Sequence, residues 1–116
     1  MCMKKIMFLM MSLSFIPFHS FAQKVEGKDV FNTKCAACHS YGQGDRIGPD
    51  LKGITQRRKA DWIKKMIKSP DTMLKSDATA KELLKKYNNI PMTNLGLKDA
   101  EVNAVMSYLK DEDAKK

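Results

Sequence analysis

The chain has 116 residues, with 21 Lys and Arg against 13 Asp and Glu and a formal net charge of +8. A chain of this length builds one domain with a small core. The basic residues are not interleaved with aromatic ones, so the composition does not indicate a nucleic-acid-binding protein.

The N-terminal segment indicates export. Two lysines near the start precede an apolar stretch over residues 6–18, and small residues close the segment at Ala22. The stretch is shorter than the ~20 residues of a membrane-spanning helix. We therefore predict a signal peptide over residues 1–22, cleaved after Ala22, and a periplasmic domain over residues 23–116. An uncleaved anchor is the alternative. Cleavage would remove both lysines and lower the formal net charge from +8 to +6.

Four helices are predicted in the rest of the chain, because apolar residues recur at helical spacing. The predicted helices span residues 25–38, 59–68, 77–87 and 98–110. Asp77 is expected to cap the third helix. Residues 42–49 and 88–96 are predicted loops, since both are rich in turn-forming residues. We expect residues 69–71 to end the second helix and residues 111–116 to form a frayed tail.

The most specific motif is Cys35-Ala36-Ala37-Cys38-His39, at the end of the first predicted helix. Cys-x-x-Cys-His is the attachment signature of c-type haem. Two thiols about one helical turn apart reach the two vinyl groups along one porphyrin edge, and the next residue supplies an imidazole nitrogen to the iron. We therefore predict one haem c, bound covalently through Cys35 and Cys38, with His39 as an iron ligand.

Cys-x-x-Cys pairs also occur in thioredoxin-like redox proteins, in zinc sites and as disulfides. The predicted mature chain keeps three Cys and His residues, one fewer than a tetrahedral structural zinc site needs. A thioredoxin-like protein needs a βαβ context, and no strand pattern surrounds the motif. A disulfide would leave His39 unexplained, so haem attachment is the interpretation we adopt.

The order of these parts over residues 25–110 resembles a class I cytochrome c, a small single-haem electron carrier. The haem motif follows the first helix, whereas in four-helix cytochromes of the c-prime kind it lies near the C-terminus. The resemblance implies an all-α cytochrome c class I fold, with about four short helices around one covalently bound haem c. It also implies that Gly27 and Phe31 pack against Val105 and Tyr108, with the small glycine allowing a close helix crossing.

A second part of the resemblance concerns the loop after the motif. Gly48-Pro49-Asp50-Leu51 is similar to the family's Gly-Pro-x-Leu loop, in which the proline carbonyl accepts a hydrogen bond from the haem histidine. Pro49 is therefore expected to orient the His39 ring. Leu51 is expected to pack on the haem face.

Other haem contacts are less specific. Gly53-Ile54-Thr55-Gln56-Arg57 is similar to a Gly-x-x-Gly-Arg stretch of the family, with Gln56 in place of the second glycine. Arg57, or equally Arg58, either contacts a haem propionate or stays solvated. Trp62 either donates its indole N–H to a propionate or packs on the porphyrin edge.

The resemblance points to Met92 as the sixth iron ligand. His39 is the one histidine of the predicted mature chain, so a second histidine ligand from the same chain is excluded. Met66 and Met106 lie on apolar faces of predicted helices and suit the core, and Met73 lies in a short connection. A lysine ligand and an open position remain further alternatives.

Met92 lies in the loop before the last helix, where class I cytochromes place the axial methionine. Relatives often have a proline directly after it, and here Thr93 follows. Asn94 is expected either to hydrogen-bond the methionine sulfur or a propionate, or to cap the loop.

The resemblance implies a monomeric periplasmic carrier that shuttles single electrons between respiratory redox partners. Such a protein is not an enzyme and has no small-molecule substrate. We expect its basic surface to steer it to acidic docking surfaces on an oxidase, reductase or dehydrogenase. The lysines of the middle third are Lys64, Lys65, Lys68, Lys75, Lys81, Lys85 and Lys86. Two alternatives are a haem subunit of a larger membrane redox complex, and a haem sensor or peroxidase-like protein with an open sixth site.

Overall fold

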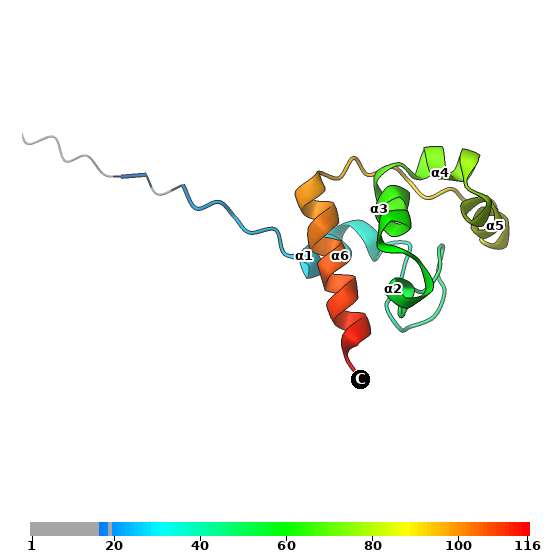
Figure 1. Cartoon of the computed structure of the whole chain (residues 1–116), viewed down its shortest axis with the longest axis horizontal. Helices are drawn as coiled ribbons and strands as arrows, with labels where there is room; N and C mark the ends of the chain where they lie inside the picture. The colour runs from blue at the N-terminus through cyan, green and yellow to red at the C-terminus, as the bar shows by residue number, and fades with distance from the viewer. Residues whose placement is uncertain (1–16, 19) are drawn as a thin grey trace, which may run out of the picture.

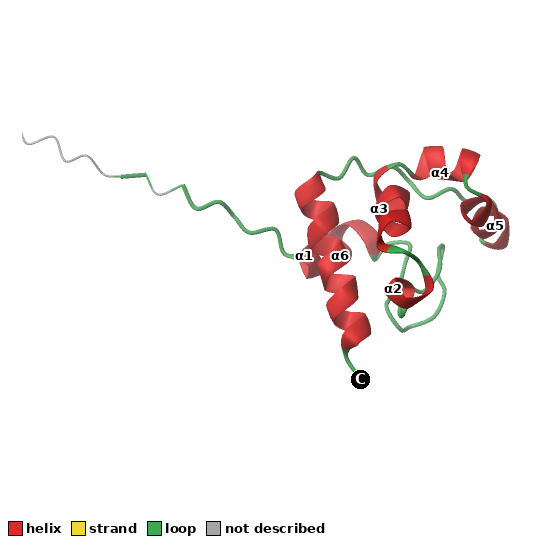
Figure 2. Cartoon of the chain, in the orientation of Figure 1, coloured by secondary structure: helices red, strands yellow, loops and turns green. Residues whose placement is uncertain are grey.

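The computed structural model describes residues 17, 18 and 20–116. This part of the chain is all-α, as expected, and contains no strand (Figure 2). An extended N-terminal segment leads into a helical body (Figure 1). Within the described residues, no helix is both long and apolar enough to span a bilayer. Most of the predicted signal peptide, residues 1–16 and 19, lies outside the described residues.

Six α-helices and one π-helical segment make up the described body. They are α1 (Gly27–Val30), η1 (Phe31–Cys35), α2 (Ile54–Arg57), α3 (Ala60–Lys68), α4 (Pro70–Ser76), α5 (Ala78–Lys86) and α6 (Asp99–Ala114). The long helix α6 crosses α1 and also contacts α2 and α3, while α4 connects α3 to α5 (Figure 1). The expected number of about four helices is therefore too low, because the two short helices α2 and α4 lack a long amphipathic pattern.

The two central helix predictions are confirmed. Helices α3 and α5 match the predicted ranges to within one residue at each end. Asp77 is the N-cap of α5, and its carboxylate accepts the backbone N–H of Ala80 at 2.8 Å. The first helix is shorter than predicted, since it begins at Gly27 and ends at Cys35.

The stop predicted at residues 69–71 is confirmed, but the short connection expected after it is a helix. Helix α3 ends at Lys68, but Pro70 then begins α4. Proline suits the first position of a helix, where no intrahelical partner for its missing N–H is needed. Met73, expected in a short connection, consequently lies inside α4 and is buried.

The frayed tail predicted at residues 111–116 is wrong. Helix α6 continues to Ala114. Its last turn is anchored because the Asp113 carboxylate accepts the backbone N–H groups of Gly53 at 2.6 Å and Thr55 at 2.9 Å. The prediction failed because charged residues at a chain end are usually solvated, whereas here the Asp113 carboxylate accepts hydrogen bonds from the segment that precedes α3.

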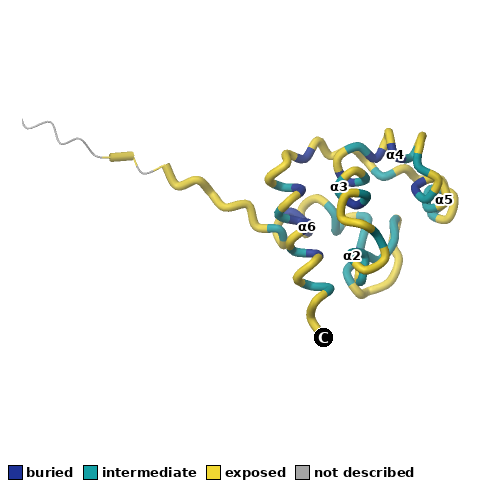
Figure 3. The backbone as a smooth tube through the Cα atoms, viewed as in Figure 1, coloured by how far each residue is buried: buried dark blue, intermediate teal, exposed yellow. Residues whose placement is uncertain are grey.

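The main hydrophobic core lies between α1, η1, α3 and α6. Buried and exposed stretches alternate along α6, as expected for a helix with one face on the core (Figure 3). The buried cluster consists of Val30, Phe31, Ile63, Ile67, Leu97, Val102, Val105, Met106 and Leu109. This core fixes the end of η1, from which the Cys-x-x-Cys-His motif continues.

The predicted contact between the first and last helices is confirmed. A Cβ atom added to Gly27 would lie 2.0 Å from the Ala104 carbonyl oxygen, so only glycine fits this crossing. The rings of Phe31 and Tyr108 lie beside the crossing with centroids 5.5 Å apart and planes tilted by 48°. This is a normal distance for an aromatic pair.

Candidate haem site

The Cys-x-x-Cys-His motif follows directly from a wide helical turn. The N–H of Ala36 donates to the carbonyl of Phe31 at 2.9 Å, which is the i to i+5 bond of a π-helix. The N–H groups of Cys38 and His39 then both donate to the carbonyl of Cys35, at 3.1 and 2.9 Å. One backbone turn therefore holds both cysteines and the histidine.

Cys35 and Cys38 are both free thiols and half-buried. Burial, followed by the neighbouring Cys38 sulfur, raises the pKa of the Cys35 thiol to about 11. A thiol with this pKa stays protonated at neutral pH, whereas redox-active and nucleophilic cysteines have lowered pKa values. Cys35 is therefore not set up as a reactive thiolate.

The His39 ring is held by the loop that follows the motif. Its Nδ1 lies 2.9 Å from the carbonyl oxygen of Pro49. A carbonyl oxygen only accepts hydrogen bonds, so Nδ1–H is the donor, and in the neutral ring the lone pair that can bind a metal lies on Nε2. This is the contact that the Gly-Pro-x-Leu resemblance implied.

Gly48 makes room for this ring. A Cβ atom at this position would lie 2.5 Å from His39 Cε1, and the Gly48 N–H also donates to the Cys38 carbonyl at 2.8 Å. The motif resemblance contained this glycine without assigning it a role. The steric requirement for glycine became visible only once the ring was placed.

Asp50 closes the same loop on itself. Its carboxylate accepts the N–H groups of Gly42 at 2.7 Å, Gly44 at 2.8 Å and Lys52 at 2.9 Å. Partial burial pushes the pKa of Asp50 upward, but the bonds from these three N–H groups outweigh it and hold the pKa below its usual value. Sequence reasoning missed this role because the x of Gly-Pro-x-Leu accepts many residue types.

Leu51 and Met92 both lie half-buried against the hydrophobic core. Leu51 follows the Gly48-Pro49-Asp50 loop, and Met92 lies in the loop between α5 and α6. Met73 and Met106 are buried, with exposed fractions of 9% and 6%. The described structure thus places Met92 in a loop and its rivals in helices.

The residues expected at the haem propionates have protein partners. Arg57 donates to the backbone carbonyls of Lys52 and, at 3.3 Å, of Asp50. The indole N–H of Trp62 donates to the Asp77 carboxylate at 3.1 Å, and the Arg58 guanidinium lies 5.5 Å from the centre of the Trp62 ring. Propionate contacts of Arg57 and Trp62 therefore stay predictions.

Asn94 behaves as a loop-capping residue. Its side-chain oxygen accepts the N–H of Gly96 at 3.0 Å, and its amide donates to the Asp71 carboxylate at 3.2 Å. Of the two interpretations of Asn94, the structure matches loop capping.

Comparison with known proteins identifies the family. Residues 25–112 match the family model described as Cytochrome c. The chain belongs to the cytochrome c family.

Individual relatives agree. This cytochrome c is 30% identical over 102 residues to cytochrome c of Stellaria longipes, covering 74% of this chain and 89% of the relative. Cytochrome c from Rhodothermus marinus superposes with a TM-score of 0.72 at 31% identity, covering 75% of this chain and 73% of that one. The cytochrome c domain of the pp3183 protein from Pseudomonas putida gives a TM-score of 0.69 at 40% identity, covering 78% and 90%.

Membership of the cytochrome c family implies a covalently bound haem c and a role in electron transfer, and homologous cytochromes c are electron carriers. The side chains of the Cys-x-x-Cys-His motif fit haem c. Cys35 and Cys38 offer two thiols from one turn, and the Pro49 contact of His39 uses Nδ1, which leaves Nε2 for the iron.

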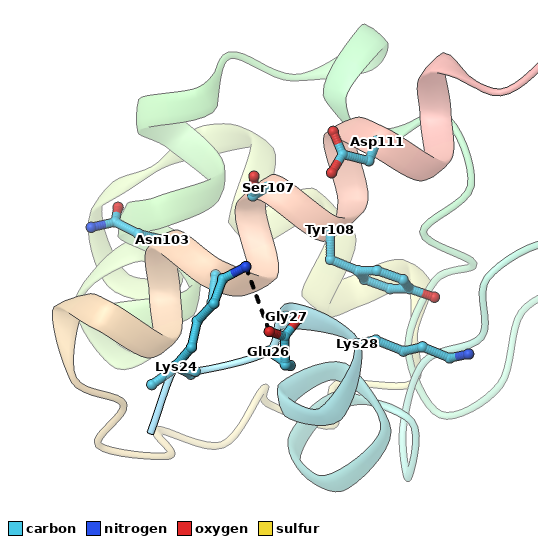
Figure 4. Close-up of a pocket in the computed structure, with 10 residues that line it drawn as sticks. Lys24, Glu26, Gly27, Lys28, Asn103, Ser107, Tyr108 and Asp111 are labelled. Carbon is cyan, nitrogen blue, oxygen red and sulfur yellow. Dashed lines mark ion pairs between the residues drawn. The ribbon is translucent and has the colours of Figure 1, made fainter. Parts of the chain in front are cut away.

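A surface groove of this cytochrome c lies elsewhere. It has a volume of about 430 Å³ and lies where the N-terminal segment and α1 meet α6 (Figure 4). The ion pair between Lys24 and Glu26 at its edge spans 3.7 Å, with side chains 87% and 59% exposed, so it stabilises little. None of the predicted haem-binding residues lines this groove.

Proposed function

We propose that this cytochrome c is a periplasmic single-electron carrier in which His39 and Met92 are the axial ligands of the haem iron. The observation that carries the proposal is the 2.9 Å hydrogen bond between His39 Nδ1 and the Pro49 carbonyl. A histidine ligand is normally oriented through its second nitrogen, because that bond fixes its tautomer and increases its basicity. His39 already has this partner.

When bound, haem c supplies an iron that accepts and releases one electron. The Met92 thioether is a soft, weak donor, and a His/Met ligand pair raises the reduction potential. Two protein ligands would also leave no position for a substrate or for oxygen. These properties suit a carrier better than a sensor or a peroxidase-like protein.

The periplasmic location is supported by the N-terminal sequence. The basic start, the short apolar stretch and the small residues before Gln23 have the order of a cleaved signal peptide. Sequencing of the purified protein is expected to give Gln23 as its first residue. An intact N-terminus would favour the anchored subunit of a larger complex.

The proposed partners are redox proteins with acidic docking surfaces. Helices α3, α4 and α5 carry seven lysines, six of which are exposed. Complementary charge speeds up encounter more than it tightens binding, which suits a monomeric protein that must leave each partner after one electron. The lysines are Lys64, Lys65, Lys68, Lys75, Lys81, Lys85 and Lys86.

Absorption spectra of the wild type and Met92→Ala test the ligand assignment. Ferric iron bound to a thioether sulfur has a weak far-red charge-transfer band. We expect the wild type to show the band and not to bind carbon monoxide when reduced, and Met92→Ala to lose the band and to bind it. A wild type that lacks the band and binds carbon monoxide would replace the carrier by an open-site sensor or catalyst.

A further inference from the structure

One carboxylate connects the segments that carry the two proposed ligands. Asp45 lies in the loop after His39, and its Oδ1 accepts the backbone N–H of Asp50 at 2.9 Å. Its Oδ2 accepts the hydroxyl of Tyr87, also at 2.9 Å, from the end of α5. The two donors are 37 residues apart in the sequence, so Asp45 joins two segments that are distant along the chain.

On the His39 side, Asp45 acts through a single peptide group. The Pro49 carbonyl, which accepts the His39 bond, and the Asp50 N–H, which Asp45 accepts, belong to the same planar unit. Fixing the N–H therefore fixes the direction of the carbonyl. Hydrogen bonds in such a chain also polarise one another.

On the Met92 side, Tyr87 is followed by a chain with little freedom. Asn88 and Asn89 both have left-handed backbones, with φ of 61° and 56°. The Asn89 N–H donates to the Leu84 carbonyl at 2.8 Å, and the Ile90 N–H donates to the Tyr87 carbonyl at 3.2 Å. The ring of Pro91, the residue before Met92, then fixes the backbone angle φ at that position. A fixed Tyr87 therefore limits where Met92 can lie.

The Tyr87 hydroxyl is suited to this bond. Burial, followed by its hydrogen bond to Asp45, raises the pKa of Tyr87. The hydroxyl consequently stays protonated and donates at neutral pH. A bond from a hydroxyl to a carboxylate is stronger than one between neutral groups.

We propose that Asp45 is a positioning residue that clasps the two axial-ligand segments together, and that its bond to Tyr87 keeps Met92 on the iron. This inference rests on the proposed His39 and Met92 ligation. We call the pair Asp45–Tyr87 the clasp. Opening the clasp frees the segment before Met92 and exposes the sixth position to an external ligand.

Imidazole binding to the ferric, haem-loaded protein tests the clasp, because imidazole occupies the iron only when Met92 leaves it. We expect Tyr87→Phe to raise the imidazole-binding constant about fivefold, which is the effect of losing one ordinary hydrogen bond, because this bond is exposed to solvent. Asp45→Ala should raise it at least as much, since it also frees the peptide after Pro49. In the Asp45→Ala background, Tyr87→Phe should have no further effect.

Tyr108→Phe is the matched control. Within the described part of the chain the Tyr108 hydroxyl makes no hydrogen bond, and its ring packs on Phe31 in the core. This variant loses the same atom without touching the clasp, so imidazole binding should stay at the wild-type value. The proposal would be overturned if Tyr108→Phe and Tyr87→Phe changed the imidazole-binding constant equally. It would also be overturned if Tyr87→Phe had the same effect in the wild-type and Asp45→Ala backgrounds.

Amide hydrogen exchange separates a failed clasp from failed Met92 ligation. If the wild type lacks the far-red band, the ligand assignment fails, but exchange at Asn89 and Ile90 still reports the clasp. Faster exchange at these two amides in Tyr87→Phe, and not in Tyr108→Phe, supports it. Unchanged exchange would mean that the clasp does not hold this segment.

Discussion

At the scale of single residues, Asp113 shows how one side chain can hold a loop. Its carboxylate accepts hydrogen bonds from Gly53 N–H at 2.6 Å, Thr55 N–H at 2.9 Å and the Thr55 hydroxyl at 2.7 Å, as well as from the Tyr41 hydroxyl. All three donor residues lie in the segment between the haem motif and α3. Asp113 thus anchors the segment that carries Pro49 and Leu51 to the end of α6.

We expect Asp113→Asn to lower the free energy of unfolding at pH 7 by about 1–2 kcal/mol, because an amide offers one acceptor oxygen in place of two. Thermal or urea unfolding followed by circular dichroism measures this. Asp111→Asn is the control, since Asp111 is exposed on the same helix. A variant as stable as the wild type would mean that the carboxylate contributes nothing to the anchor.

The pH dependence of this effect has a definite sign. Partial burial pushes the pKa of Asp113 upward, but the hydrogen bonds from Tyr41, Thr55 and Gly53 outweigh it and lower the pKa below its usual value. A carboxyl group whose pKa is lower in the folded state stabilises that state at pH values above its unfolded-state pKa of about 3.9. The stability difference between wild type and Asp113→Asn should therefore persist at neutral pH and shrink as the pH falls below about 4.

At the scale of elements, the crossing of α1 and α6 decides where the haem motif begins. Gly27 allows the backbones to approach, and the pair Phe31–Tyr108 fills the space beside it. The π-helical turn of η1 then leads from this crossing to Cys35. Tight packing at one end of the helix therefore fixes the position of the cysteines at the other.

Gly27→Ala should destabilise the protein by about 1–3 kcal/mol, because the new Cβ would overlap the Ala104 carbonyl and Tyr108 Cβ. In an isolated helix the same change stabilises, since alanine has the higher helix propensity. The sign of the change in melting temperature therefore distinguishes the effect of helix packing from that of helix propensity. Lys28→Ala, on the exposed side, should leave the melting temperature nearly unchanged, and a rise for Gly27→Ala would contradict the close crossing.

At the scale of the whole molecule, positive charge is the dominant surface property. The formal net charge is +8 for the full chain, and +6 after the predicted loss of Lys4 and Lys5. A charge of this size steers small charged reactants as well as proteins. Steering by the net charge can therefore be tested without knowing the natural partner.

The oxidation rate of the ferrous protein by hexacyanoferrate(III), an anion, should fall about tenfold as salt rises from about 0.01 M to about 1 M. Oxidation by the cation tris(phenanthroline)cobalt(III) should speed up over the same range, because salt screens the repulsion. Stopped-flow absorbance measures both rates. The same salt dependence for the two oxidants would exclude steering by net charge.

Local patterns were enough to predict much of this protein. The Cys-x-x-Cys-His motif and the Gly-Pro-x-Leu loop are contiguous, so their chemistry is readable from neighbouring residues, and the His39–Pro49 contact lies where the resemblance implied. Helices α3 and α5 were also predictable, since each has an amphipathic pattern, and α5 has a capping aspartate as well.

Contacts between distant residues could not be predicted in this way. The Asp45–Tyr87 bond spans 42 residues and the Tyr41–Asp113 bond spans 72, and nothing near either residue indicates its partner. The need for glycine at position 48 is likewise set by atoms of His39, whereas the close crossing at Gly27 was implied by the family resemblance. The sequence by itself determined the haem motif and the main helices, because these depend on neighbouring residues. Only the tertiary structure decided which charges anchor loops, because a charged side chain looks solvated until its partner is brought beside it.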